Sequence, residues 1–147
     1  MGSPMRIAGH PVHPMLVHFP LVLWTGAVAL DLGGLATGRE WTWQLSFLCQ
    51  ALGLATAAIA ILAGFLEFTS IARAHPARDT AVSHMLVMCT VWLLFLFSVA
   101  LRGSAPATAP TVWATAVAVA AFLLMVFGGW LGGRLVYRFG IGVQARR

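Results

Sequence analysis

Three of the five histidines in this chain lie within one short stretch near its start. The stretch, GHPVHPMLVHFP at residues 9–20, places His10, His13 and His18 among three prolines. Histidine is the commonest metal ligand, and its charge changes near neutral pH. A cluster of histidines at the start of an apolar segment is therefore where we expect the chemistry of this protein.

The prolines predict the local backbone of this stretch. Pro11 and Pro14 each disfavour helical backbone in the residue before them, so we expect His10 and His13 on an extended lead-in. Pro14 suits the first turn of a helix, because the N–H that it lacks would have no helical partner there. His18 then falls one turn inside that helix.

The composition is that of a membrane protein. Of the 147 residues, 60% are hydrophobic and only 9% are charged, and the mean hydropathy is +0.88. All basic residues are arginine, and the formal net charge is +5. In so apolar a chain this charge indicates arginines flanking a lipid bilayer, and no basic run with interleaved aromatics points to a nucleic-acid partner.

Four stretches are long enough to cross a bilayer, whose hydrocarbon core of about 30 Å needs roughly 20 helical residues. They lie at roughly 15–36, 43–68, 81–102 and 111–133. The short connections between them make neighbouring helices antiparallel. We therefore predict an all-α fold, an up-down four-helix bundle that forms one domain over residues 5–147. The opening MGSP, residues 1–4, resembles a remnant of cloning.

The arginines predict the orientation in the membrane. Arg39 and Arg102 flank one side, and the arginines on the side that bears both termini are Arg6, Arg73, Arg78, Arg134, Arg138, Arg146 and Arg147. By the positive-inside rule, both termini should be cytoplasmic. The same topology places all five histidines on that side, together with Glu67 at the end of the second span.

Helical phase predicts which side chains face the interior of the bundle. Small residues mark one face of the second span, and Glu67 lies near that face, so we expect it to point inward. His84 shares a face of the third span with Val91 and Phe95, so it should be interior too. In the fourth span, Gly129 and Gly133 predict a close packing seam or a homodimer contact.

The first hypothesis for the cofactor is a b-type haem. The first and third helices are diagonal in an up-down bundle, so His18 and His84 should face each other across the core at similar depth. A planar macrocycle held by two imidazoles would fill that separation. His10 and His13 are alternative axial ligands. No C-x-x-C-H motif occurs, so a covalently attached haem is not expected.

Two alternatives stay open. His10, His13, His84 and Glu67 together supply three imidazoles and a carboxylate, with His18 as a further ligand, which suits zinc or iron in a non-redox or transport-accessory protein. The other reading is structural: the histidines and Glu67 form a hydrogen-bonded polar plug. The chain carries no hydrolase, kinase or nucleotide-binding motif, so we expect an electron carrier or redox subunit rather than a hydrolase or transferase.

The chain resembles a bacterial membrane-protein family known as domain of unknown function 2231. The resemblance rests on GHPVHPMLVHFP at residues 9–20 and GGWLGGRLVYRFGIGV at residues 128–143. It implies four membrane helices in the bacterial inner membrane. Some members are joined to Rieske-type domains, which implies electron transfer with a Rieske-type protein, another redox protein or a quinone as partner.

The resemblance also implies site residues. The signature histidines would be His10, His13 and His84, and the acid that ends the second helix would be Glu67. Arg134 stands where the family often has an acid. We expect its guanidinium to pair with haem propionates and to disfavour a nearby dication, since arginine–carboxylate pairing is strong.

Overall fold

The structure, a computed structural model, describes residues 6–8, 10–103 and 108–143. The expected remnant at residues 1–4 lies outside the described residues. The elements in chain order are β1 (Arg6–Ile7), β2 (His10–Pro11), α1 (Val12–Leu16), α2 (His18–Thr37), α3 (Glu40–Thr69), α4 (Arg78–Ala100) and α5 (Val112–Tyr137).

Four helical spans are long and apolar enough to cross a membrane. α1 and α2 together form the first, Val12–Thr37, and α3, α4 and α5 are the others. The four spans predicted from hydropathy are therefore confirmed, with small shifts at their ends. The fold is all-helical apart from a ribbon of two very short antiparallel strands at the start, in which Ile7 pairs with His10.

The first span begins earlier than the prolines predict. His13 lies within α1 rather than on an extended lead-in, so that expectation was wrong. Pro11 is the extended residue that caps the helix, and Pro14 occupies its first turn, where its missing N–H loses nothing. Pro20 has no N–H to donate to the carbonyl of Leu16, which accounts for the interruption between α1 and α2.

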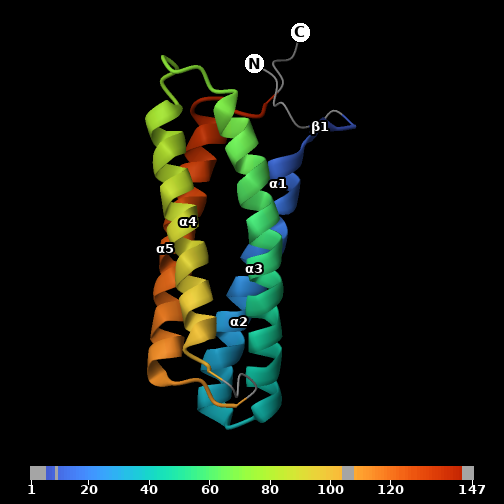
Figure 1. Ribbon diagram of the computed structural model, residues 1–147, viewed down its shortest axis with the longest axis vertical. Coiled ribbons are helices and arrows are strands. Elements are labelled where there is room, and N and C mark those ends of the chain that lie inside the picture. Colours follow the sequence, from blue (N-terminus) through green and yellow to red (C-terminus); the bar gives the residue numbers. More distant parts are fainter. Residues whose placement is uncertain (1–5, 9, 104–107, 144–147) are drawn as a thin grey trace.

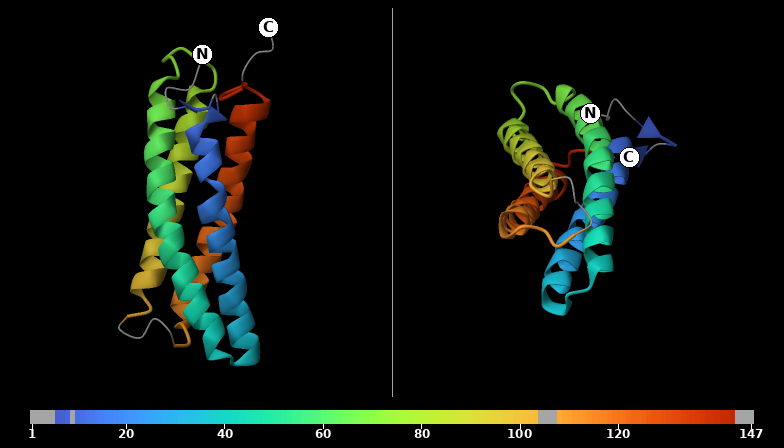
Figure 2. Two further views of the ribbon diagram at one scale, coloured as in Figure 1. Left: turned by 90° about the vertical axis from the view of Figure 1, so that its right-hand side faces the viewer. Right: turned by 60° about the horizontal axis from the view of Figure 1, so that its bottom comes forward.

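The helices pack as two antiparallel hairpins. α2 lies along α3 and α4 lies along α5, and the hairpins meet mainly where α3 contacts α4 and α2 contacts α5 (Figures 1 and 2). The described chain begins and ends at the same end of the bundle (Figure 1). This is the up-down arrangement that short connections predict.

The core lies between the hairpins and is closed by one aromatic pair. Trp24 of α2 stacks on Phe95 of α4 with ring centroids 4.4 Å apart, and both side chains are almost completely buried. Around them pack small and branched residues of all four spans, among them Ala57, Val91 and Ala121. Leucine, valine and phenylalanine side chains cover the outside of the helices, the surface that lipid would contact.

Candidate functional site

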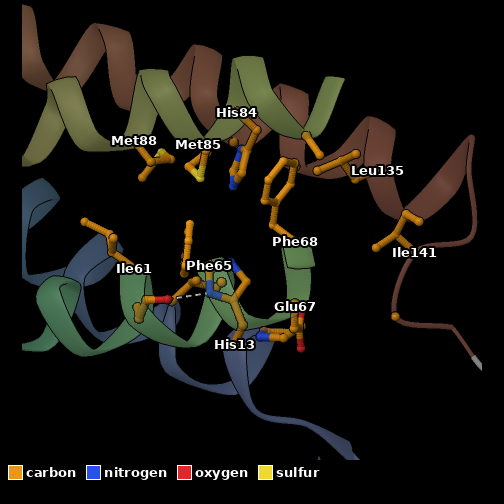
Figure 3. A pocket seen from close by; sticks show the side chains of 18 of the residues that line it. His13, Ile61, Phe65, Glu67, Phe68, His84, Met85, Met88, Leu135 and Ile141 are labelled. Carbon is orange, nitrogen blue, oxygen red and sulfur yellow. Dashed lines mark hydrogen bonds between the residues drawn. The ribbon is translucent and has the colours of Figure 1, made fainter. Parts of the chain in front are cut away.

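A cavity of about 310 Å³ opens at the end of the bundle where the described chain begins and ends. Residues from α1 to α5 line it, and most of them are apolar (Figure 3). His13 and His84 project into this cavity from opposite walls, His13 from α1 and His84 from α4. Side chains of both hairpins therefore line the same cavity.

The ring of His13 is fixed by the backbone of the neighbouring helix. Its Nδ1 lies 2.8 Å from the carbonyl oxygen of Ala60 in α3. A carbonyl oxygen only accepts hydrogen bonds, so Nδ1 must carry the hydrogen and donate it. In the neutral ring, the lone pair of His13 then lies on Nε2.

His84 is held in the same way by the other hairpin. Its Nδ1 donates to the carbonyl oxygen of Gly128 in α5, 2.9 Å away. The same reasoning places the lone pair of the neutral ring on Nε2. Metal-ligating histidines commonly donate their other ring N–H to a backbone carbonyl, which fixes the ring orientation and makes the ligating nitrogen more basic.

A glycine makes room for each imidazole. A Cβ added at Gly64 would lie 2.8 Å from Cε1 of His13, and one added at Gly132 would lie 3.2 Å from Cε1 of His84. Any larger residue would push the ring away from its carbonyl. Gly64 and Gly132 each stand one helical turn after the residue that accepts the imidazole hydrogen bond.

The remaining cavity wall is soft and apolar. Met85, Met88 and Cys89 line it on the α4 side, and Phe65 and Phe68 line it on the α3 side. Sulfur and aromatic side chains are polarizable and adapt to irregular ligands. The wall therefore favours an apolar ligand, or a soft metal ion, over a hydrated one.

The structure brings only part of the predicted histidine cluster together. His84 faces the interior, as its phase predicted, and Glu67 lines the cavity beside His13 (Figure 3). His18 is exposed on α2 and is not among the cavity residues, so the predicted facing of His18 and His84 was wrong. Five residues of helix turn the side chain by about 140°, so His13 and His18 cannot share a face.

His10 and Arg134 lie away from the cavity wall. His10 is exposed on the strand ribbon, where its Nδ1 donates to the carbonyl oxygen of Ala8. The guanidinium of Arg134 lies over the ring of Trp130, 5.0 Å from its centroid. In the described part of the chain, no three histidine, cysteine, aspartate or glutamate side chains are close enough to hold a metal ion. The four-ligand set with His10 and Glu67 is not assembled there.

A second polar centre, at the opposite end of the bundle, was missed from the sequence. Asp31 of α2 and Arg102, just after α4, form a buried ion pair. Gln50 donates a hydrogen bond to Oδ2 of Asp31, and Arg102 donates a second one to the hydroxyl of Ser46. The signal was an acid inside one apolar span and an arginine at the end of another, since such residues almost always pair inside the bundle.

Comparison with known families identifies the chain. No curated protein and no solved structure matches it. Residues 9–145 match the family described as a predicted membrane protein (DUF2231). The match covers nearly the whole sequence and both motifs that suggested it. The chain therefore belongs to this family of predicted membrane proteins.

Proposed function

We propose that this protein is a membrane-embedded electron-transfer protein that holds a b-type haem between His13 and His84. One observation carries the proposal: two imidazoles from different hairpins enter one apolar cavity, each with Nδ1 tied to a backbone carbonyl. Both Nε2 lone pairs are therefore available for a group between them. A bis-histidine haem takes two such ligands, whereas a structural zinc ion takes four.

The cavity fits part of such a group as it stands. Its volume of about 310 Å³ lies at the lower end of the range for ligand pockets, roughly 300–1,000 Å³. A whole macrocycle would require side chains that line the cavity, such as Phe65 and Phe68, to move.

When bound, the haem would supply a one-electron redox centre. The chain's own residues set its environment. The carbonyls of Ala60 and Gly128 fix the orientation of the ligands and raise their basicity, and the apolar wall keeps water out, two factors that tune a reduction potential. Glu67 is the acidic group at the cavity edge.

The arginine distribution supports an inner-membrane orientation with the histidine cavity toward the cytoplasm. The cavity end carries most of the arginines. Two arginines, Arg39 and Arg102, lie at the other end, so the count of arginines favours the cavity end as the cytoplasmic one. A Rieske-type protein, another redox protein or a quinone would then exchange electrons with the site.

A second candidate is a soft metal ion. The thioethers of Met85 and Met88 line the same cavity as the two imidazoles. Thioether and imidazole ligands together suit copper(I) better than zinc. This donor set would serve a metal-binding or transport-accessory role without a haem.

The test is the absorption spectrum of the protein purified in detergent after expression with a haem precursor. We expect a Soret band in the parent, lost in His84→Ala and in His13→Ala, and retained in His18→Ala as the matched control. Elemental analysis of the same samples separates the candidates, since copper without haem would support the second one. A parent with no Soret band and no bound metal would overturn both.

A further inference from the structure

Buried positions recur along the two ascending helices at a constant spacing. Each buried residue of α3 has a buried counterpart 68 positions later. The pairs are Thr42 and Pro110, Ser46 and Ala114, Gln50 and Ala118, Gly53 and Ala121, Ala57 and Met125, Ala60 and Gly128, and Ala63 and Leu131. α3 and α5, together with Pro110 just before α5, therefore bury residues at matching intervals along their lengths.

In the descending helices, four buried residues of α2 have buried counterparts 71 positions later, whereas the counterpart of buried Val28, Val99, is only partly buried. The corresponding pairs of buried residues are Pro20 and Val91, Trp24 and Phe95, Ala27 and Ser98, and Asp31 and Arg102. Burial alone would be weak evidence, because any two helices in a bundle bury a stripe every three or four residues. The chemistry at the paired positions is stronger evidence.

The same two spacings relate the interactions. His13 and His84 are 71 apart, and the carbonyls that accept from them, at Ala60 and Gly128, are 68 apart. The glycines against the two rings are 68 apart as well. The stacked rings of Trp24 and Phe95 are counterparts that meet each other, as residues on a twofold axis must.

The serines carry the relation to the other end of the bundle. The hydroxyl of Ser46 donates to the carbonyl of Ala27, and the hydroxyl of Ser98 donates to the carbonyl of Ala114. Ala27 corresponds to Ser98, and Ser46 corresponds to Ala114. A serine–carbonyl hydrogen bond thus joins the same two positions in both hairpins. The serine lies on the second helix of the first hairpin and on the first helix of the second hairpin.

We infer that the chain is a duplicated helical hairpin whose two copies, α1–α3 and α4–α5, pair about an approximate twofold axis. Asp31 and Arg102 occupy the same position in the two copies and pair with each other. Two identical hairpins would bring two aspartates or two arginines together, which is unfavourable in a buried site. Each hairpin therefore packs against a hairpin with the same pattern of buried positions, in which the residue at the Asp31/Arg102 position carries the opposite charge.

Only one copy carries the polar partners of this pair. Ser46 and Gln50 of α3 hydrogen-bond to Arg102 and Asp31, whereas their counterparts in α5 are Ala114 and Ala118. This asymmetry gives a sharp test, because under a twofold relation the whole polar site can be moved to the other copy. A charge reversal alone would leave the hydrogen-bonding residues on the wrong helix.

The experiment compares melting temperatures of full-length variants in detergent. The rotated variant carries Asp31→Arg, Arg102→Asp, Ser46→Ala, Gln50→Ala, Ala114→Ser and Ala118→Gln. The matched control carries only Asp31→Arg and Arg102→Asp. We expect the rotated variant to melt well above the control and close to the parent. A rotated variant that melts at or below the control would overturn the inference.

A milder pair of variants decides the question if the rotated variant does not fold. A Cβ at Gly53 would collide with the indole of Trp24, so a tryptophan at position 95 should need a glycine at position 121. We expect Phe95→Trp alone to lower the melting temperature. The four-site variant, which adds Ala121→Gly, Trp24→Phe and Gly53→Ala to Phe95→Trp, should recover it. A four-site variant no more stable than Phe95→Trp alone would contradict the twofold relation.

Discussion

The two ends of the bundle use the same framework in opposite ways. At one end, His13 and His84 extend from the two hairpins toward each other across a cavity of about 310 Å³. At the other end, Asp31 of α2 and Arg102, just after α4, contact each other directly, with almost no exposed surface. The first end has an open cavity lined mostly by apolar side chains, with Glu67 among them, and the second end has a closed contact between two charged groups.

The proposed function rests on this difference between the two ends. The ion pair joins Nη2 of Arg102 to Oδ2 of Asp31, while among the described residues Oδ1 of Asp31 and Nε and Nη1 of Arg102 have no hydrogen-bond partner. Two imidazoles that each donate Nδ1–H to a carbonyl have, in their neutral form, only lone pairs left, and lone pairs cannot satisfy each other. Under the proposed function, the histidine end takes a ligand, whereas the ion-pair end holds the two hairpins together.

The largest effect should follow from breaking the ion pair on one side. Arg102→Met leaves the carboxylate of Asp31 buried without its cation, which costs about 3–5 kcal/mol of unfolding free energy. Thermal or denaturant unfolding in detergent measures the loss. Arg39→Met, at an exposed position near the same end, is the matched control and should change stability by less than about 0.5 kcal/mol.

The double variant Asp31→Leu/Arg102→Met sharpens this prediction. Replacing both charges with apolar side chains removes the desolvation cost, so most of the stability lost in the single variant should return. If the double variant is as unstable as Arg102→Met, the hydrogen bonds of Gln50 and Ser46 contribute more than the charges do.

An intermediate effect is expected from crowding the imidazoles. Gly64→Ala places a methyl group 2.8 Å from the His13 ring, and such overpacking costs about 1–3 kcal/mol. Gly132→Ala should cost less, because its Cβ would lie 3.2 Å from the His84 ring. Both variants should also lower haem occupancy, since each moves a ligand away from its carbonyl.

Gly129→Ala is the control for the crowding variants. It lies on the same helix as Gly132 and also borders the cavity, but a Cβ there meets nothing within 4 Å. Replacing glycine by alanine within a helix should then stabilise the protein by up to about 1 kcal/mol. A loss of stability in Gly129→Ala would instead indicate that this surface packs against another molecule, as the predicted homodimer contact requires.

The smallest effect should come from Arg134. Its guanidinium lies over Trp130 outside the cavity wall, and an exposed cation–π contact contributes about 0.5–1 kcal/mol. We therefore expect Arg134→Glu to lower the melting temperature slightly and to weaken haem retention only as far as a propionate at the cavity edge depends on it. A loss of haem as complete as in His84→Ala would place Arg134 within the cofactor site.

The sequence predicted the helices well because their cause is local. Length and hydropathy determine where a chain can cross a bilayer, and short connections determine that neighbouring spans are antiparallel. The inward phase of His84 followed from the apolar residues of its own helix. Each of these predictions needed only the residues of one span.

The partners across the bundle could not be predicted in the same way. Whether His13 or His18 faces the core depends on where the first helix begins. Because α1 begins at Val12, His13 is part of the helix and not of the lead-in before it. The pairing of Asp31 with Arg102 depends on the relative height of two spans that are 71 residues apart. Neither follows from the pattern of a single helix.

The most direct test of the central claim is the low-temperature electron paramagnetic resonance spectrum of the oxidised, haem-loaded protein. Two imidazoles on one iron, one from each hairpin, predict a low-spin ferric signal in the parent. His13→Ala and His84→Ala should each convert any haem that remains to a high-spin signal, and His18→Ala should leave the low-spin signal unchanged. A parent whose low-spin signal survives the loss of His13 and disappears with His18 would contradict the proposed two-histidine site.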